Sequence, residues 1–85
     1  MALIKFFASL RNASGVKEAT VQGATIGEVI AEAVKQYPGL SSLLLEDGQV
    51  RPHVVVTING QPTKDMEAAV TAQDLIAIFP PIAGG

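Results

Sequence analysis

The stretch TIGEVIAEAVKQYPG, residues 25–39, predicts the main helix of the chain. Thr25 is followed three residues later by Glu28, which fits a capping box in which each residue accepts from the other's backbone N–H. Pro38-Gly39 ends the helical pattern. Apolar residues recur at helical spacing between these signals, at Val29, Ile30, Ala33, Val34 and Tyr37. We therefore predict a helix over 26–37 with one apolar face, which needs a partner layer.

Short β-prone stretches surround this helix and supply that layer. They are LIKFFA (3–8), VKEATVQ (16–22), VVVTI (54–58), QPTK (61–64) and LIAIF (75–79). Between them we predict a turn at 9–15, a short irregular helical segment at 40–47 and a loop at 48–52. The order indicates an α+β, β-grasp-like fold, in which a mixed sheet of about five strands carries one main helix on one face. The first and last strands would pair in parallel at its centre.

Strand alternation predicts which side chains lie on the uncovered face of this sheet. Since Lys5 should avoid the core, Leu3 and Phe7 share its face, whereas Ile4, Phe6 and Ala8 point at the helix. In the last strand, Ile76 and Ile78 are the core pair, which leaves Phe79 outside with Leu75 and Ala77. Val55 and Thr57 belong to the uncovered face by the same reasoning. Phe7 and Phe79 should therefore meet there and form an apolar patch of the kind that binds partners.

Composition narrows the classes of function. The chain has 85 residues, a net charge of −2 and six scattered Lys and Arg residues, which argues against nucleic acid binding. It has no Cys and one His, so we expect no metal site and no bound cofactor. The apolar N-terminal stretch is too short to span a membrane and does not have the basic start of a signal peptide. We therefore expect a cytoplasmic protein without membrane association.

The last residues, FPPIAGG (79–85), have no reactive side chain. Pro80 and Pro81 favour an extended start, and glycines let a backbone pass a narrow channel. Residues 80–85 could reach about 20 Å at about 3.3–3.6 Å per residue. We therefore divide the chain into a globular domain, 1–79, and an extended flexible tail, 80–85, which enters another protein's active site with the Gly85 carboxylate as its only reactive group.

Four segments carry a resemblance to a known family: IKFFASLR, EDG at 46–48, VVVTING and DLIAIFPPIAGG. Together they resemble the MoaD/ThiS family of sulfur carriers, which are ubiquitin-like β-grasp proteins. The resemblance covers the whole chain. Its specific part is the PPIAGG ending after an aromatic residue, which is most similar to the small subunit of molybdopterin synthase.

The resemblance implies a reaction cycle for a subunit that is not an enzyme alone. An adenylyltransferase of the ubiquitin-activating type would use ATP to adenylate Gly85, and a sulfur donor would convert it to a thiocarboxylate. The tail would then enter the molybdopterin synthase large subunit, with Gly84 supplying clearance. The partner-binding residues implied are Phe7, Arg11, Phe79, Pro80, Pro81 and Ile82.

Other readings share this chemistry. The chain would otherwise carry sulfur for thiamin, cysteine or tRNA thiolation, since the ING turn recurs across carrier branches. As a member of a different class, it would be a ubiquitin-like modifier joined to lysines through Gly85. A plain interaction domain with an inert tail is the remaining alternative, and a solvated loop charge is the alternative for Arg11.

Overall fold

The computed structural model describes residues 2–80, and residues 1 and 81–85 lie outside the described part. Five strands form one sheet in the order β2-β1-β7-β5-β6. They are β1 (Ala2–Phe6), β2 (Glu18–Val21), β5 (Val55–Ile58), β6 (Gln61–Thr63) and β7 (Leu75–Phe79). The first and last strands are parallel neighbours, and the other pairs are antiparallel. This confirms the predicted α+β, β-grasp arrangement.

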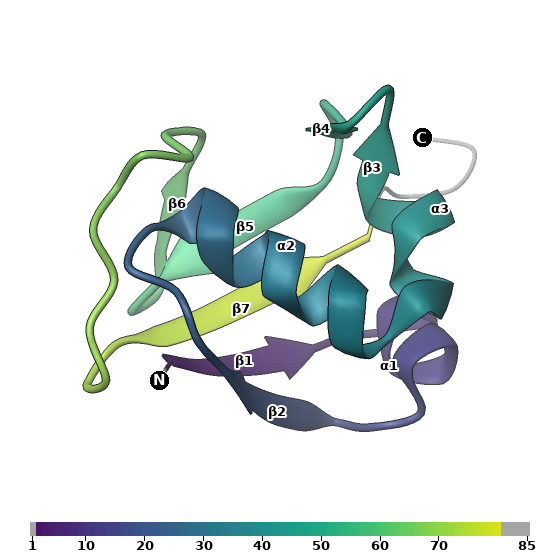
Figure 1. Ribbon diagram of the computed structural model, residues 1–85, viewed down its shortest axis with the longest axis horizontal. Helices are drawn as coiled ribbons and strands as arrows, with labels where there is room; N and C mark the ends of the chain where they lie inside the picture. The colour runs from purple at the N-terminus through teal and green to yellow at the C-terminus, as the bar shows by residue number, and fades with distance from the viewer. Residues whose placement is uncertain (1, 81–85) are drawn as a thin grey trace.

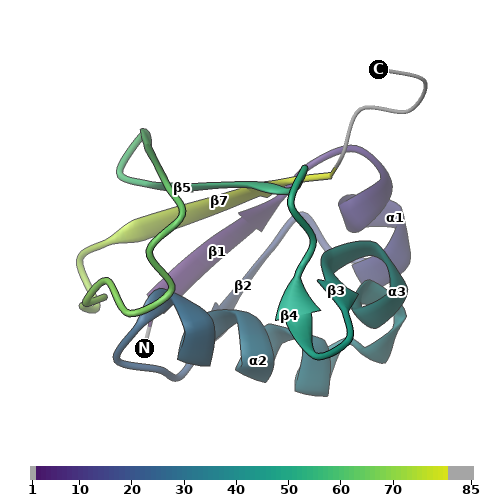
Figure 2. The same ribbon diagram turned by 90° about the horizontal axis from the view of Figure 1, so that it is seen from above.

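Helix α2 (Ile26–Gln36) packs across one face of this sheet, as Figures 1 and 2 show. It buries Ile26, Val29, Ile30 and Ala33. The Thr25 hydroxyl accepts a hydrogen bond from the Glu28 backbone N–H at 3.2 Å, as predicted. The second half of the predicted capping box is shifted by one residue, because the Glu28 carboxylate accepts from the Ala24 N–H at 2.9 Å and not from Thr25.

The first turn of α2 is also tied to the segment that precedes β7. The Ile26 N–H donates to the Ala68 carbonyl at 3.0 Å and the Gly27 N–H to the Met66 carbonyl at 2.8 Å. N–H groups in the first turn of a helix have no partner within the helix. Here a distant part of the chain supplies their acceptors, which fixes the segment after β6 against the helix.

The predicted turn at 9–15 is wrong, since the chain forms helix α1 (Ser9–Ser14) there. Leu10 is fully buried and anchors this short helix to the core. Gly15 follows with φ of 81°, a left-handed conformation that suits glycine at the end of a helix. The assignment of Ala8 to the core is also wrong. Strand β1 ends at Phe6, and Ala8 is exposed with φ of 53°.

The segment after α2 is more ordered than predicted. A 3-10 turn η1 (Pro38–Leu40) and helix α3 (Ser41–Leu44) bury Leu40 and Leu44. Strands β3 (Leu45–Glu46) and β4 (Gln49–Val50) then form a separate hairpin where we predicted the end of a helical segment and a loop. Arg51 ties the hairpin to α3, since its Nε donates to the Ser42 carbonyl at 3.1 Å and its Nη1 lies 3.3 Å from a Glu46 oxygen.

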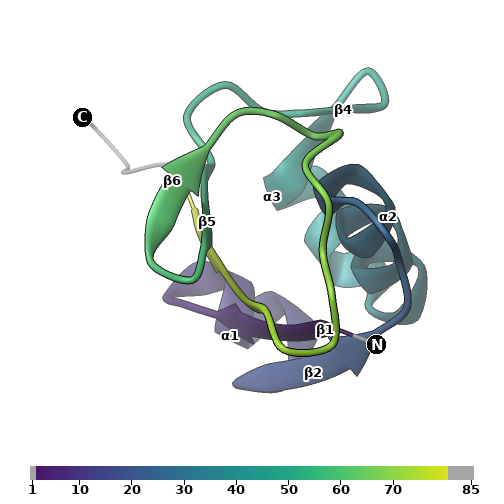
Figure 3. The same ribbon diagram turned by 90° about the vertical axis from the view of Figure 1, so that its left-hand side faces the viewer.

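The sheet and α2 form two layers, which Figure 3 shows from the side, and the buried core side chains lie between them. Side chains alternate along β1 and β7 between buried and half-buried. The buried members of β1 and β7 are Ala2, Ile4, Phe6, Ile76 and Ile78. The predicted face assignment is therefore confirmed for every strand residue it named except Ala8. Among residues 2–80, no helix crosses the opposite face, which we call the open face.

Candidate partner-binding surface

Two phenylalanines meet on the open face where β1 and β7 end. The rings of Phe7 and Phe79 are stacked, with centroids 4.5 Å apart and planes inclined by 15°. Val55 pairs with Phe79 in the β5–β7 register and is 44% exposed. We call Phe7, Val55 and Phe79 the aromatic patch. Phe7 and Phe79 are half-buried, and a cluster of partly exposed apolar side chains is typical of a surface that a partner covers.

Arg11 projects from α1 beside this patch. It lines a small cavity of about 160 Å³ together with Phe7 and the lysines Lys5 and Lys17. These three cations are scattered along the sequence, yet β1, α1 and the residue just before β2 bring them together. The one carboxylate among the lining residues is Glu18. Within residues 2–80, none of the three cations forms a salt bridge. The structure therefore places a cationic group next to the aromatic patch, which sequence reasoning found only in part, through Arg11.

The predicted tail begins at this surface. Pro80 follows Phe79 directly and is half-buried. The rest of the predicted tail, residues 81–85, lies outside the described residues, including Pro81, Ile82, Gly84 and Gly85, to which roles were assigned. Their roles therefore stay predictions, as does the boundary between residues 79 and 80.

Asp74, which lies just before β7, is held by hydrogen bonds from Asn59 and Thr71. The Asp74 carboxylate accepts from the Asn59 side-chain amide at 2.9 Å and from the Thr71 N–H at 2.7 Å. These hydrogen bonds, chiefly that of Asn59, lower the pKa of Asp74 from its ordinary value of 3.8. Asn59 also accepts from the Leu75 N–H at 2.9 Å, so the network joins the β5–β6 turn to the start of β7. Its role is to hold two turns together.

Residues 2–80 contain no group of three His, Cys, Asp or Glu side chains placed to hold a metal ion. In the same range, every helix is too short or too polar to cross a membrane.

Comparisons with known proteins agree with this geometry. A model of the ThiS family matches residues 4–85. Small archaeal modifier protein 3 of Haloferax volcanii is 38% identical over 96% of both chains. The molybdopterin synthase sulfur carrier subunit of Arabidopsis thaliana is 34% identical over 96% of this chain and 80% of that protein. The solution structure of small archaeal modifier protein 1 from Methanosarcina acetivorans superposes with a TM-score of 0.90, at 28% identity over 99% of this chain and 95% of that one.

The fold and the sequence thus lead to the same group of proteins. The β-grasp architecture matches the solved relative along nearly its whole length, and the family model extends through the last residue. The expected resemblance to the MoaD/ThiS group is confirmed: this chain belongs to the ThiS family.

Proposed function

We propose that this protein is a sulfur carrier whose Gly85 carboxylate is activated and converted to a thiocarboxylate. The observation that supports this most is the position of the aromatic patch, at the end of β7 and immediately before residues 80–85. A partner that covers Phe7 and Phe79 holds the globular domain at the point where the tail leaves it. The tail is then directed into that partner's active site.

The chemistry starts from an unreactive group. A carboxylate is a poor acyl donor, so an adenylyltransferase of the ubiquitin-activating type joins Gly85 to the AMP part of ATP and releases pyrophosphate. A sulfide-level donor then attacks the acyl carbon, the bond to AMP breaks, and AMP leaves with the electron pair. The product is a thiocarboxylate whose sulfur is a soft nucleophile. Since the chain has no Cys, no side-chain thiol competes for this role.

The sulfur acceptor that we propose first is the large subunit of molybdopterin synthase, with this chain as the small subunit. The Arabidopsis relative is the sulfur carrier subunit of that enzyme. In this role, the loaded tail would enter the large subunit and give up its sulfur, and Gly84 would supply clearance because it has no Cβ to meet the channel wall.

A second candidate is conjugation to other proteins. It is supported by the similarity to small archaeal modifier protein 3. The same acyl adenylate would then react with the amine of a substrate lysine, and an isopeptide bond would form in place of the thiocarboxylate. Both functions need the same activated terminus and the same partner surface.

Reconstitution with the activating enzyme, ATP and a sulfide donor tests the proposal. The intact protein should gain the mass that corresponds to one oxygen replaced by sulfur. A variant without Gly85, and one with a single residue added after it, should gain none while keeping the wild-type melting temperature. If either variant is loaded normally, the terminal carboxylate is not the carrier group.

A further inference from the structure

A cavity with a largely apolar lining lies on the helix side of the sheet. Its volume is about 390 Å³, within the range of small-ligand pockets, about 300–1,000 Å³. The first half of α2, the β3–β4 hairpin and the strands β5 and β6 form its walls. Apolar lining comes chiefly from Ile30, Leu45, Val54, Val56 and Met66.

The charge of this cavity is opposite to that of the chain. The protein has a net charge of −2 and eight Asp and Glu residues. None of them lines the cavity, whereas the two cations Arg51 and Lys64 do. Arg51 is paired with Glu46. The Lys64 Nζ instead donates to the Pro52 carbonyl at 2.8 Å and forms no salt bridge within residues 2–80. The cavity therefore combines a largely apolar lining with the Lys64 ammonium group, whose charge no carboxylate within residues 2–80 neutralises.

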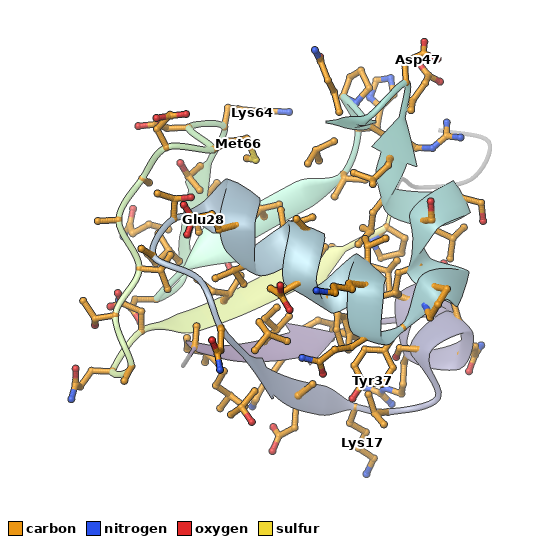
Figure 4. The ribbon with its side chains drawn as sticks, in the orientation of Figure 1. Lys17, Glu28, Tyr37, Asp47, Lys64 and Met66 are labelled. Carbon is orange, nitrogen blue, oxygen red and sulfur yellow. The ribbon has the colours of Figure 1, made fainter. Side chains whose placement is uncertain are left out.

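The shape of the depression favours an extended occupant. A smaller cavity of about 170 Å³ shares Val54, Val56, Thr63 and Lys64 with the first and continues to Val55. Figure 4 shows Lys64 and Met66 pointing from the β6 end of the molecule toward the β3–β4 hairpin. The two cavities meet at these four shared residues, and we call them together the trough. A trough of this kind fits a short stretch of polypeptide better than a compact molecule.

We propose that this trough binds a peptide segment of a protein partner, with aliphatic side chains in the larger cavity and an acidic side chain at Lys64. Burial of apolar surface is the main favourable contribution to most protein association, and charges at the rim select the partner. Neither Phe7 nor Phe79 lines the trough. A partner on the aromatic patch and the peptide in the trough therefore contact different groups of residues, apart from Val55.

A titration of the ¹⁵N-labelled chain followed by NMR tests this. The probes are two eight-residue peptides that share an Ile-Leu pair and differ only in two following residues, which are glutamates in one and lysines in the other. The acidic peptide should shift the amides of Gly27, Ile30 and Thr63 and bind about five-fold more tightly than the lysine peptide, as expected for a charge at a solvent-exposed rim. Equal affinities, or shifts confined to Phe7 and Phe79, would overturn the proposal.

Two variants sharpen the test. Lys64→Glu, at an exposed position, should reverse the preference between the two peptides, which a loss of folding cannot imitate. Ala31→Leu should fill the larger cavity and abolish binding of both peptides, whereas Gln36→Leu on the same helix, outside the lining, should not. If octanoate shifts the cavity amides and the acidic peptide does not, the site takes a small aliphatic carboxylate and the peptide proposal is wrong. Since no ATP or activating enzyme is present, the outcome is independent of sulfur loading.

Discussion

Phe6 and Phe7 are neighbours in the chain and lie on opposite faces of the sheet. Phe6 is 1% exposed and packs edge-to-face on Tyr37, with ring centroids 6.1 Å apart. Phe7 is half-buried and stacks on Phe79. Both side chains have an aromatic partner, so aromatic contact alone does not distinguish their roles. Burial does, because only Phe6 is enclosed by the core, whereas Phe7 leaves apolar surface for another protein to cover.

Phe6→Ala should have the largest effect on stability. Removing a fully buried phenylalanine side chain costs about 3–5 kcal/mol, a large share of the total stability of about 5–15 kcal/mol that small proteins have. Urea unfolding should show this loss as a lower midpoint with an unchanged slope. A loss below about 1 kcal/mol would mean that Phe6 does not anchor the core.

Phe7→Glu should weaken partner binding, whereas Phe6→Ala weakens folding. We expect the complex with the activating enzyme to weaken by about 2 kcal/mol or more, roughly 30-fold, as for a central interface residue. Phe79→Ala should act in the same direction. Calorimetric titration measures the binding, with Gln36→Glu at an exposed position of α2, on the other side of the sheet, as a control. A Phe7 variant that melts early but binds normally would show that the open face is not the docking surface.

Arg11→Ala should have a smaller effect on the same complex. Exposed ion pairs contribute about 0.2–1 kcal/mol, so the dissociation constant should rise about two- to five-fold. The difference from wild type should shrink as salt is added, because screening already weakens exposed charges. Lys35→Ala, on the far side of α2 from the sheet, is the matched control. Equal loss in both variants, or no loss of affinity at low salt, would leave Arg11 as a solvated charge on α1.

Asp74→Asn tests a contact that belongs to neither face and should change stability least at neutral pH. Because folding lowers the pKa of Asp74, this carboxylate stabilises the native state above its unfolded value of 3.8. That contribution is lost as the pH falls below 3.8 through the lower folded pKa. Melting temperatures measured from pH 7 to pH 2 should therefore converge between the variant and wild type in acid. Parallel curves would contradict the assigned hydrogen bonds.

Much of the fold could be predicted because the apolar residues follow two regular spacings, one typical of a helix and one typical of strands. Helical spacing identified α2, and strand alternation assigned Phe6, Phe7, Ile78 and Phe79 to the correct faces. The prediction failed where few residues determine the structure. The six residues of α1 resemble a turn because Asn and Ser favour turns, and only Leu10 and Gly15 signal a helix.

Parts of the candidate site depend on contacts between distant segments, which one sequence does not display. The meeting of Lys5, Arg11 and Lys17 requires β1, α1 and the segment between α1 and β2 to be placed first. The same holds for the trough, whose walls come from α2, the β3–β4 hairpin and β6. Gly39 gives a further example. In the sequence, this glycine indicated only the end of the main helix. A Cβ at this position would lie 2.6 Å from the Ala13 carbonyl oxygen. Glycine therefore also permits α1 to approach η1.

The central claim, that Gly85 carries sulfur, is tested most directly by the intact mass of the untagged protein purified from its own host. We predict a population in which one oxygen of the terminal carboxylate is replaced by sulfur, and in which the change maps to Gly85 after proteolysis. A copurifying large subunit would name the acceptor. A chain that stays unmodified after its activating enzyme and ATP are supplied, or one found only in isopeptide bonds to lysines, would contradict the sulfur-carrier account.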